Sequence, residues 1–129
     1  GYGRYSYELN DAELAGCFHL DDADISFIKT RRGDSNRLGI ALQLTTVRFL
    51  GTFLPDPTDV PISVIAFVAD QIDVFETTCL AGYMGRKVTR YTHVNDIKRQ
   101  YGYSEFNSPP WRFRLTRILY SRAFFFDCN

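Results

Sequence analysis

The chain has 129 residues and no net charge, and 45% of its residues are hydrophobic and 16% aromatic. That length has room for one domain or two very small ones, and the apolar content is typical of a globular protein. No apolar run approaches the roughly 18 residues that a membrane-spanning helix needs. The start shows no basic region followed by an apolar one, so we expect neither a membrane segment nor a signal peptide.

Three predicted helices in the first half each follow a polar side chain that can cap a helix N-terminus. The candidate caps are, in chain order, Asn10 or Asp11, then Asp21 or Asp22, then Asp34, Ser35 or Asn36. They begin a short helix through Phe18, a second helix that carries Ile25 and Ile28, and a long helix from Arg37 to about Thr52.

A proline-rich break then separates the two halves of the chain. The run Leu54-Pro55-Asp56-Pro57 interrupts the helical pattern and is the best internal boundary. We therefore predict a first helical subdomain over residues 1–56 and a second, helix-turn-helix-like one over residues 57–129. Asp59, with Pro61 in the first turn, begins the next helix, whose apolar positions are Val64, Ile65, Val68 and Ile72.

The second half repeats this pattern of caps and stops. Thr78 can cap a short helix, Cys79–Met84, which Gly85 ends. Thr89 can cap the next helix, which ends at Gly102. The apolar side of that helix is formed by Tyr91, Val94, Ile97 and Tyr101.

A last predicted helix runs from Trp111 to about Phe125, opened by Ser108 and Pro109-Pro110. No stretch shows the sustained alternation of apolar and polar residues that a half-buried strand requires. We therefore predict an all-α fold, a compact multi-helix bundle of two small subclusters with helix-turn-helix-like elements. The helix-turn-helix order is read over Cys79–Gly102.

The sequence predicts no metal site and no catalytic site. Asp21, Asp22 and Asp24 lack the central glycine and distal glutamate of a calcium loop, so helix capping is the favoured interpretation. His19 and His93 have neither metal-ligand spacing nor a neighbouring nucleophile. We expect His19 to be structural. His93 is placed on the polar side of its helix, where it is exposed or contacts a phosphate.

The three cysteines, Cys17, Cys79 and Cys128, are too widely spaced for a zinc site. We expect them to be small apolar side chains in a reducing cytosol, and we expect no disulfide.

The charges are unevenly distributed along the chain. Residues 1–85 carry 6 Lys+Arg and 12 Asp+Glu, whereas residues 86–122 carry 9 Lys+Arg against Asp96 and Glu105. A local excess of this size creates a field that a polyanion feels whatever the total charge is. The alternative interpretation is a solvated basic face that pairs with the acidic half.

Arginines at the start of the long predicted helix favour an anion-binding surface. Arg31 and Arg32 lie near its amino end, where unpaired amide donors and the helix dipole attract phosphate. Arg37 and Arg48 are 11 residues apart, which is about three helical turns. We therefore predict that these four arginines form one positive surface.

Two amides and the second half of the chain add further candidates. Asn36 and Gln43 could read an adenine edge in the major groove, and a satisfied, partly buried amide is an equal alternative for Gln43. In the second half we place Arg90, His93, Arg99 and Gln100 on the outward side of their helix, with Arg90 the first candidate for base reading. Arg112, Arg114 and Arg117 suit phosphate contacts. The predicted DNA-contacting residues are Arg31, Arg32, Asn36, Arg37, Arg48, Arg86, Lys87, Arg90, His93, Arg99, Arg112, Arg114 and Arg117.

Four segments carry a resemblance to a known family: His19–Asp24, Arg31–Leu54, Asp56–Pro61 and Tyr101–Leu115. The last has the pattern Tyr-Gly-Tyr-x-x-Phe-x-x-Pro-Pro-x-Arg-Phe-Arg-Leu. Over most of residues 4–123, in one register, the chain resembles the amino-terminal region of transposases of the Tn-three class. These are the enzymes of replicative transposons with short terminal inverted repeats.

The resemblance implies sequence-specific binding of double-stranded DNA at the terminal inverted repeats, in the bacterial cytoplasm at the nucleoid. It places the catalytic region, of RNase-H type with an acidic triad and Mg²⁺, beyond Asn129, so we expect no enzyme activity and no cofactor for this chain. It leaves dimerisation of the full-length transposase open. Phe124–Asn129 departs from the family pattern. The alternatives are a helical protein–protein interaction module within a transposase or regulator, and a small enzyme whose site the sequence does not reveal.

Overall fold

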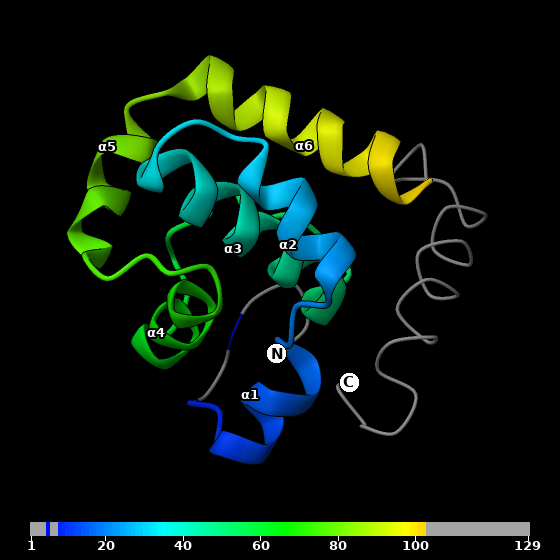
Figure 1. Ribbon diagram of the computed structural model, residues 1–129, viewed down its shortest axis with the longest axis vertical. Helices are drawn as coiled ribbons and strands as arrows, with labels where there is room; N and C mark the ends of the chain where they lie inside the picture. Colours follow the sequence, from blue (N-terminus) through cyan, green and yellow to red (C-terminus); the bar gives the residue numbers. More distant parts are fainter. Residues whose placement is uncertain (1–4, 6–7, 103–129) are drawn as a thin grey trace.

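Helix α3 (Asp34–Leu50) runs through the centre of the computed structural model, which describes residues 5 and 8–102 (Figure 1). Every residue from Leu38 to Val47 is buried, so protein surrounds this helix on all sides. The elements around it are α1 (Asp11–Cys17), α2 (Asp22–Lys29), α4 (Ile62–Gln71), a 3-10 turn η1 (Thr77–Cys79), α5 (Leu80–Met84) and α6 (Lys87–Tyr101).

The first two helices begin where the capping side chains predict. Asn10 caps α1, and its side chain and that of Glu13 accept hydrogen bonds from each other's backbone amides, at 2.8 and 3.0 Å. Asp21 and Asp24 form the same reciprocal arrangement at the start of α2. These capping boxes satisfy amide donors that the helix itself leaves unpaired.

Three later helices begin at residues other than the predicted ones. α3 begins at Asp34, and its N-cap is Gly33, whose φ of +85° suits glycine. α4 begins after Pro61, so Asp59 is not its cap. α6 begins at Lys87, two residues before Thr89. The predicted helix ends agree better with the structure. For example, α6 ends at Gly102, which adopts the left-handed conformation.

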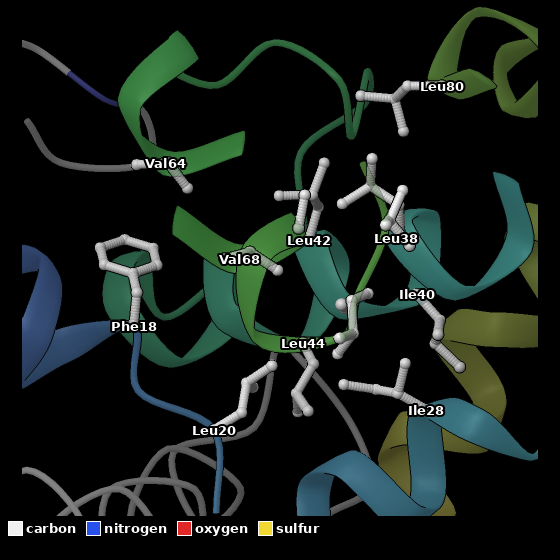
Figure 2. Close-up of a cluster of buried hydrophobic side chains, with 14 of the residues drawn as sticks. Phe18, Leu20, Ile28, Leu38, Ile40, Leu42, Leu44, Val64, Val68 and Leu80 are labelled. Carbon is white, nitrogen blue, oxygen red and sulfur yellow. The ribbon is translucent and has the colours of Figure 1, made fainter. Parts of the chain in front are cut away.

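A single group of buried apolar side chains lies around α3 in the described residues (Figure 2). Phe18 and Ile28 pack onto it from the side of α1 and α2, and Val64 and Val68 pack onto it from α4. Ile97 of α6 belongs to the same cluster. Helices from both sides of the predicted boundary therefore share one core, and burial of these side chains is the main force that holds α4 and α6 in place.

Every element of the described residues is helical, which confirms the all-α prediction. The division into residues 1–56 and 57–129 and the helix-turn-helix-like assignment stay predictions. The last predicted helix, Trp111 to about Phe125, lies outside the described residues.

Candidate nucleic-acid interface

The structure joins two basic segments that lie 50 residues apart in the sequence. Arg86, at the start of α6, donates a hydrogen bond from its guanidinium to the Asn36 side-chain oxygen at 3.1 Å. Asn36, in the first turn of α3, donates in turn to the Arg32 carbonyl at 2.9 Å. Lys87 adjoins Arg86 and is exposed. We call Arg32, Asn36, Arg86 and Lys87 the basic corner.

Two further predicted arginines near this corner stabilise the fold. Arg37 is half-buried and donates to the carbonyls of Arg31 and Lys29 at 2.9 and 3.2 Å, which holds the loop between α2 and α3. Arg31 donates to the Asp96 carboxylate at 2.5 Å, and its guanidinium lies over the Phe27 ring. The charge of Arg31 is therefore largely compensated inside the protein.

Arg48 does not face solvent, and its predicted place on a shared positive surface is wrong. Its guanidinium binds the Asp24 carboxylate through two hydrogen bonds, at 2.9 and 2.7 Å, and its side chain is only 6% exposed. It also lies over the Tyr101 ring. The helical spacing from Arg37 is correct, but α2 and α6 cover this part of α3 and supply the carboxylate and the ring.

His93 is also not at the surface, because it is only 4% exposed and points inward from α6. Gln43 donates to the Tyr83 hydroxyl at 2.8 Å, and that hydroxyl is hydrogen-bonded to Nδ1 of His93 at 2.7 Å. Gln43 also donates to the Arg90 carbonyl at 3.2 Å. We call Gln43, Tyr83 and His93 the buried polar network, and it ties α3, α5 and α6 together. Gln43 is thus the satisfied buried amide, one of its two predicted alternatives.

The buried polar network shifts the pKa of its titratable members. Burial, together with the nearby Arg31 charge, lowers the pKa of His93 to about 4, against the opposing effect of Asp96. Burial raises the pKa of Tyr83 to about 12, although the bond from Gln43 and the Arg90 and Arg31 charges oppose the rise. At neutral pH His93 is therefore uncharged and cannot attract a phosphate.

The remaining arginines of α6 differ in their surroundings. Arg90 is half-buried, and its Nε is buried without a hydrogen-bond partner among the described residues. Arg99 is exposed and forms an ion pair with Asp96, the carboxylate that Arg31 also binds. Arg112, Arg114 and Arg117 lie outside the described residues.

Two of the three cysteines lie in the described residues. Cys17 is disulfide-bonded, so the expectation of no disulfide is wrong. The spacing of cysteines along a chain does not indicate which thiols the fold brings within bonding distance. Cys79 is a free, half-buried thiol, and burial with the Asp34 and Glu76 charges raises its pKa.

Residues 5 and 8–102 contain neither a candidate metal site nor a candidate membrane-spanning helix. No group of three His, Cys, Asp or Glu side chains there could hold a metal ion. Within the same residues, no helix is both long enough and apolar enough to span a bilayer.

A family described as "Domain of unknown function (DUF4158)" matches residues 1–127. The chain belongs to this family. The DUF4158 chain is 54% identical over 122 residues to the transposase for transposon gamma-delta of Escherichia coli K12, an alignment that covers 95% of the chain and 12% of that relative. It is 36% identical over 86 residues to the transposase for transposon Tn501 of Pseudomonas aeruginosa, an alignment that covers 67% of the chain and 9% of that relative. It is 30% identical over 99 residues to the transposase for transposon Tn1546 of Enterococcus faecium, an alignment that covers 77% of the chain and 10% of that relative.

These relatives confirm the resemblance to the transposases of Tn-three-class elements. The DUF4158 chain spans about a tenth of the length of the curated relatives that it matches. No solved structure matches it.

Sequence reasoning missed the contact that creates the basic corner. Arg86 and Asn36 were both candidates, but helix spacing relates residues only within one helix. Helix spacing also predicted Tyr91 on the apolar inner side of its helix. In the structure the Tyr91 side chain is 68% exposed. The buried pair His93 and Ile97 defines the inner side, and Tyr91 lies away from it.

Proposed function

We propose that this chain binds double-stranded DNA and recognises terminal inverted repeats as the amino-terminal part of a transposase. The observation that carries the proposal is the basic corner. Arg32, Arg86 and Lys87 come from two segments, each at the start of a long helix, and all three are exposed. Cations next to helix N-termini form a surface that suits phosphate groups.

The distribution of charge supports the same surface. Residues 86–102 carry five Lys+Arg, namely Arg86, Lys87, Arg90, Lys98 and Arg99, and one acidic residue. That acid, Asp96, is only 14% exposed at its side chain and binds two arginines. Lys87 is exposed at the start of α6, and Arg99 is exposed at its end although it pairs with Asp96, so the positive excess of the helix faces solvent.

The names of the relatives supply the biological context. Each is named as a transposase for a transposon, and each is about ten times longer than the part that this chain matches. We place strand transfer, its acidic triad and its Mg²⁺ in the remainder of such a protein, in the bacterial cytoplasm. The function proposed for this chain is DNA binding without catalysis.

The direct test is a titration of the full chain, residues 1–129, with two duplexes of equal length. One carries the inverted repeat that flanks the gene for this chain, and the other carries the same bases in scrambled order. We expect tighter binding of the inverted repeat by at least about tenfold, with log Kd rising linearly with log salt concentration. Equal affinity for the two duplexes would leave only non-specific binding, and no measurable affinity would refute the proposal.

The last predicted helix can be tested in the same titration. We propose that Arg112, Arg114 and Arg117 contact phosphates, so Arg114→Ala should weaken binding to both duplexes alike. The salt slope should fall by about one for each lost phosphate contact. An effect of Arg114→Ala confined to the inverted repeat would instead assign it to base reading.

A further inference from the structure

We infer that the outer face of α6, formed by Val88, Tyr91, Thr92 and Asn95, reads base edges in the major groove of DNA. This inference rests on the proposed DNA binding and adds to it the residues that set sequence preference. The four residues occur at positions i, i+3, i+4 and i+7, so they form one stripe along the helix.

This stripe is turned away from the rest of the described protein. The inner side of α6 is fixed by His93 and Ile97, which are buried. Val88 and Tyr91 are 78% and 68% exposed, and Thr92 is exposed while Asn95 is half-exposed. Figure 1 shows α6 along one edge of the molecule, with α3 and α2 to one side of it.

The exposed apolar groups on this stripe have no packing role among the described residues. The described residues include four large apolar side chains that are strongly exposed, and two of them, Val88 and Tyr91, lie on the same turn of α6. The other two are Ile62, the first residue of α4, and Phe75, between α4 and η1. Apolar groups on a basic helix are suited to a partner that is both polyanionic and partly apolar.

Charge complementarity identifies duplex DNA as that partner. Lys87 lies at the beginning of the stripe and Arg99 near its end, and both are exposed. A helix of 15 residues is about 22 Å long, and the major groove is about 12 Å wide, so α6 can lie in the groove with a cation near each phosphate backbone. The stripe between the two cations then faces the base edges.

The side chains of the stripe match what base edges present in the major groove. An asparagine can bond to N6 and N7 of adenine through both ends of its amide, which assigns Asn95 to an adenine. The methyl groups of Val88 and Thr92 suit the C5-methyl group of thymine. Tyr91 can contact sugar or phosphate through its hydroxyl. Arg90 and His93 are not base readers in this arrangement, because both lie on the inner side of α6, where His93 is buried and the Arg90 carbonyl accepts from Gln43.

The buried polar network fixes the rotation of α6 about its axis. His93 bonds to Tyr83, and the Arg90 carbonyl accepts from Gln43, so two points on the inner side of α6 are held against α5 and α3. This attachment leaves the outer stripe in one orientation, which base reading requires.

The test uses the full chain and duplexes selected by repeated rounds of binding from a random pool. We expect the wild-type chain to select a preferred sequence that contains adenine and thymine positions sensitive to major-groove changes. Replacing one adenine by 7-deazaadenine, or one thymine by uracil, should weaken wild-type binding by about tenfold. Asn95→Ala should bind as weakly and lose its response to 7-deazaadenine, and Val88→Ala should lose its response to uracil.

Ile62→Ala is the matched control, because Ile62 is an exposed apolar residue outside α6. It should keep the wild-type preference and both responses. If the chain binds duplexes but selects no sequence, or if both α6 variants respond to the altered bases as the wild type does, this inference is refuted and DNA binding stands. If the wild-type chain binds no duplex at all, the proposed function itself fails.

Discussion

The carboxylate of Asp24 holds the guanidinium of Arg48, and this buried pair joins α2 to α3. The Tyr101 hydroxyl donates to the same carboxylate at 2.5 Å, which brings the end of α6 into the group. Burial alone would raise the pKa of Asp24, but the bonds and charge of Arg48 and the bond from Tyr101 lower it to about 2. Asp24 is therefore ionised in the folded protein at neutral pH, and its partner Arg48 is a structural residue.

We predict that Arg48→Ala lowers the free energy of unfolding by about 3–5 kcal/mol, because it leaves the Asp24 charge buried without its partner. Urea denaturation measures this change. Lys29→Ala is the control, since the Lys29–Asp73 pair is exposed and worth at most about 1 kcal/mol. Equal losses for the two variants would contradict the buried role of Arg48.

A second prediction concerns the closest approach between α3 and α5. A Cβ at Gly39 would lie 2.3 Å from the Tyr83 ring, so Gly39→Ala forces that ring to move and disturbs its bonds to Gln43 and His93. We expect a loss of about 1–3 kcal/mol in the free energy of unfolding.

The control for Gly39 is another helical glycine, Gly82, where the nearest atom to an added Cβ is the Ser35 hydroxyl at 3.9 Å. Gly82→Ala should leave stability unchanged or raise it by up to about 1 kcal/mol, because alanine favours the helix. Thermal or urea unfolding of both variants measures these changes in the free energy of unfolding. A stable Gly39→Ala protein would show that α3 and α5 are not packed this closely.

A third prediction is a pH dependence that originates at His93. Its pKa is about 4 in the folded protein and 6.5 as the ordinary value, so the unfolded chain binds one more proton between these limits. Stability should therefore fall as the pH drops from about 6.5 to 4, by about 3 kcal/mol at most. The Asp24 contribution is lost only at lower pH, below 3.8 and toward about 2.

His93→Gln separates this effect from other titrations. The variant removes the titrating ring, so its stability should change less between pH 6.5 and 4 than that of the wild type. Urea denaturation at a series of pH values provides the comparison. Identical pH profiles for the two proteins would mean that His93 is not buried as a neutral ring.

Local signals in the sequence identified the helices well, but they did not identify which residues of other helices pack against each one. Asn10 and Asp21 act as predicted because a capping bond involves residues three apart. Gly102 ends α6 for an equally local reason, its positive φ. The start of α6 was placed too late because its N-cap, Arg86, makes no side-chain capping bond, so no capping residue marks the start in the sequence.

The same limit explains the corrections at the candidate interface. Arg48 and His93 have the residue types and spacing of surface ligands, but Asp24 and Tyr83 reach them from other helices and bury them. Conversely, Tyr91 has the spacing of a core residue and is exposed. Which side of a helix faces inward depends on its tertiary partners, so helix spacing alone could not predict which of these side chains the fold buries.

The central claim is that the basic corner grips DNA phosphates, and its most direct test is the salt dependence of a double variant. Arg86→Ala/Lys87→Ala should weaken binding to the inverted repeat and to the scrambled duplex alike, and should lower the salt slope by up to about two. Lys29→Ala, which removes a cation that faces Asp73, should leave the slope unchanged. A double variant with the wild-type slope and affinity would show that DNA does not contact this corner.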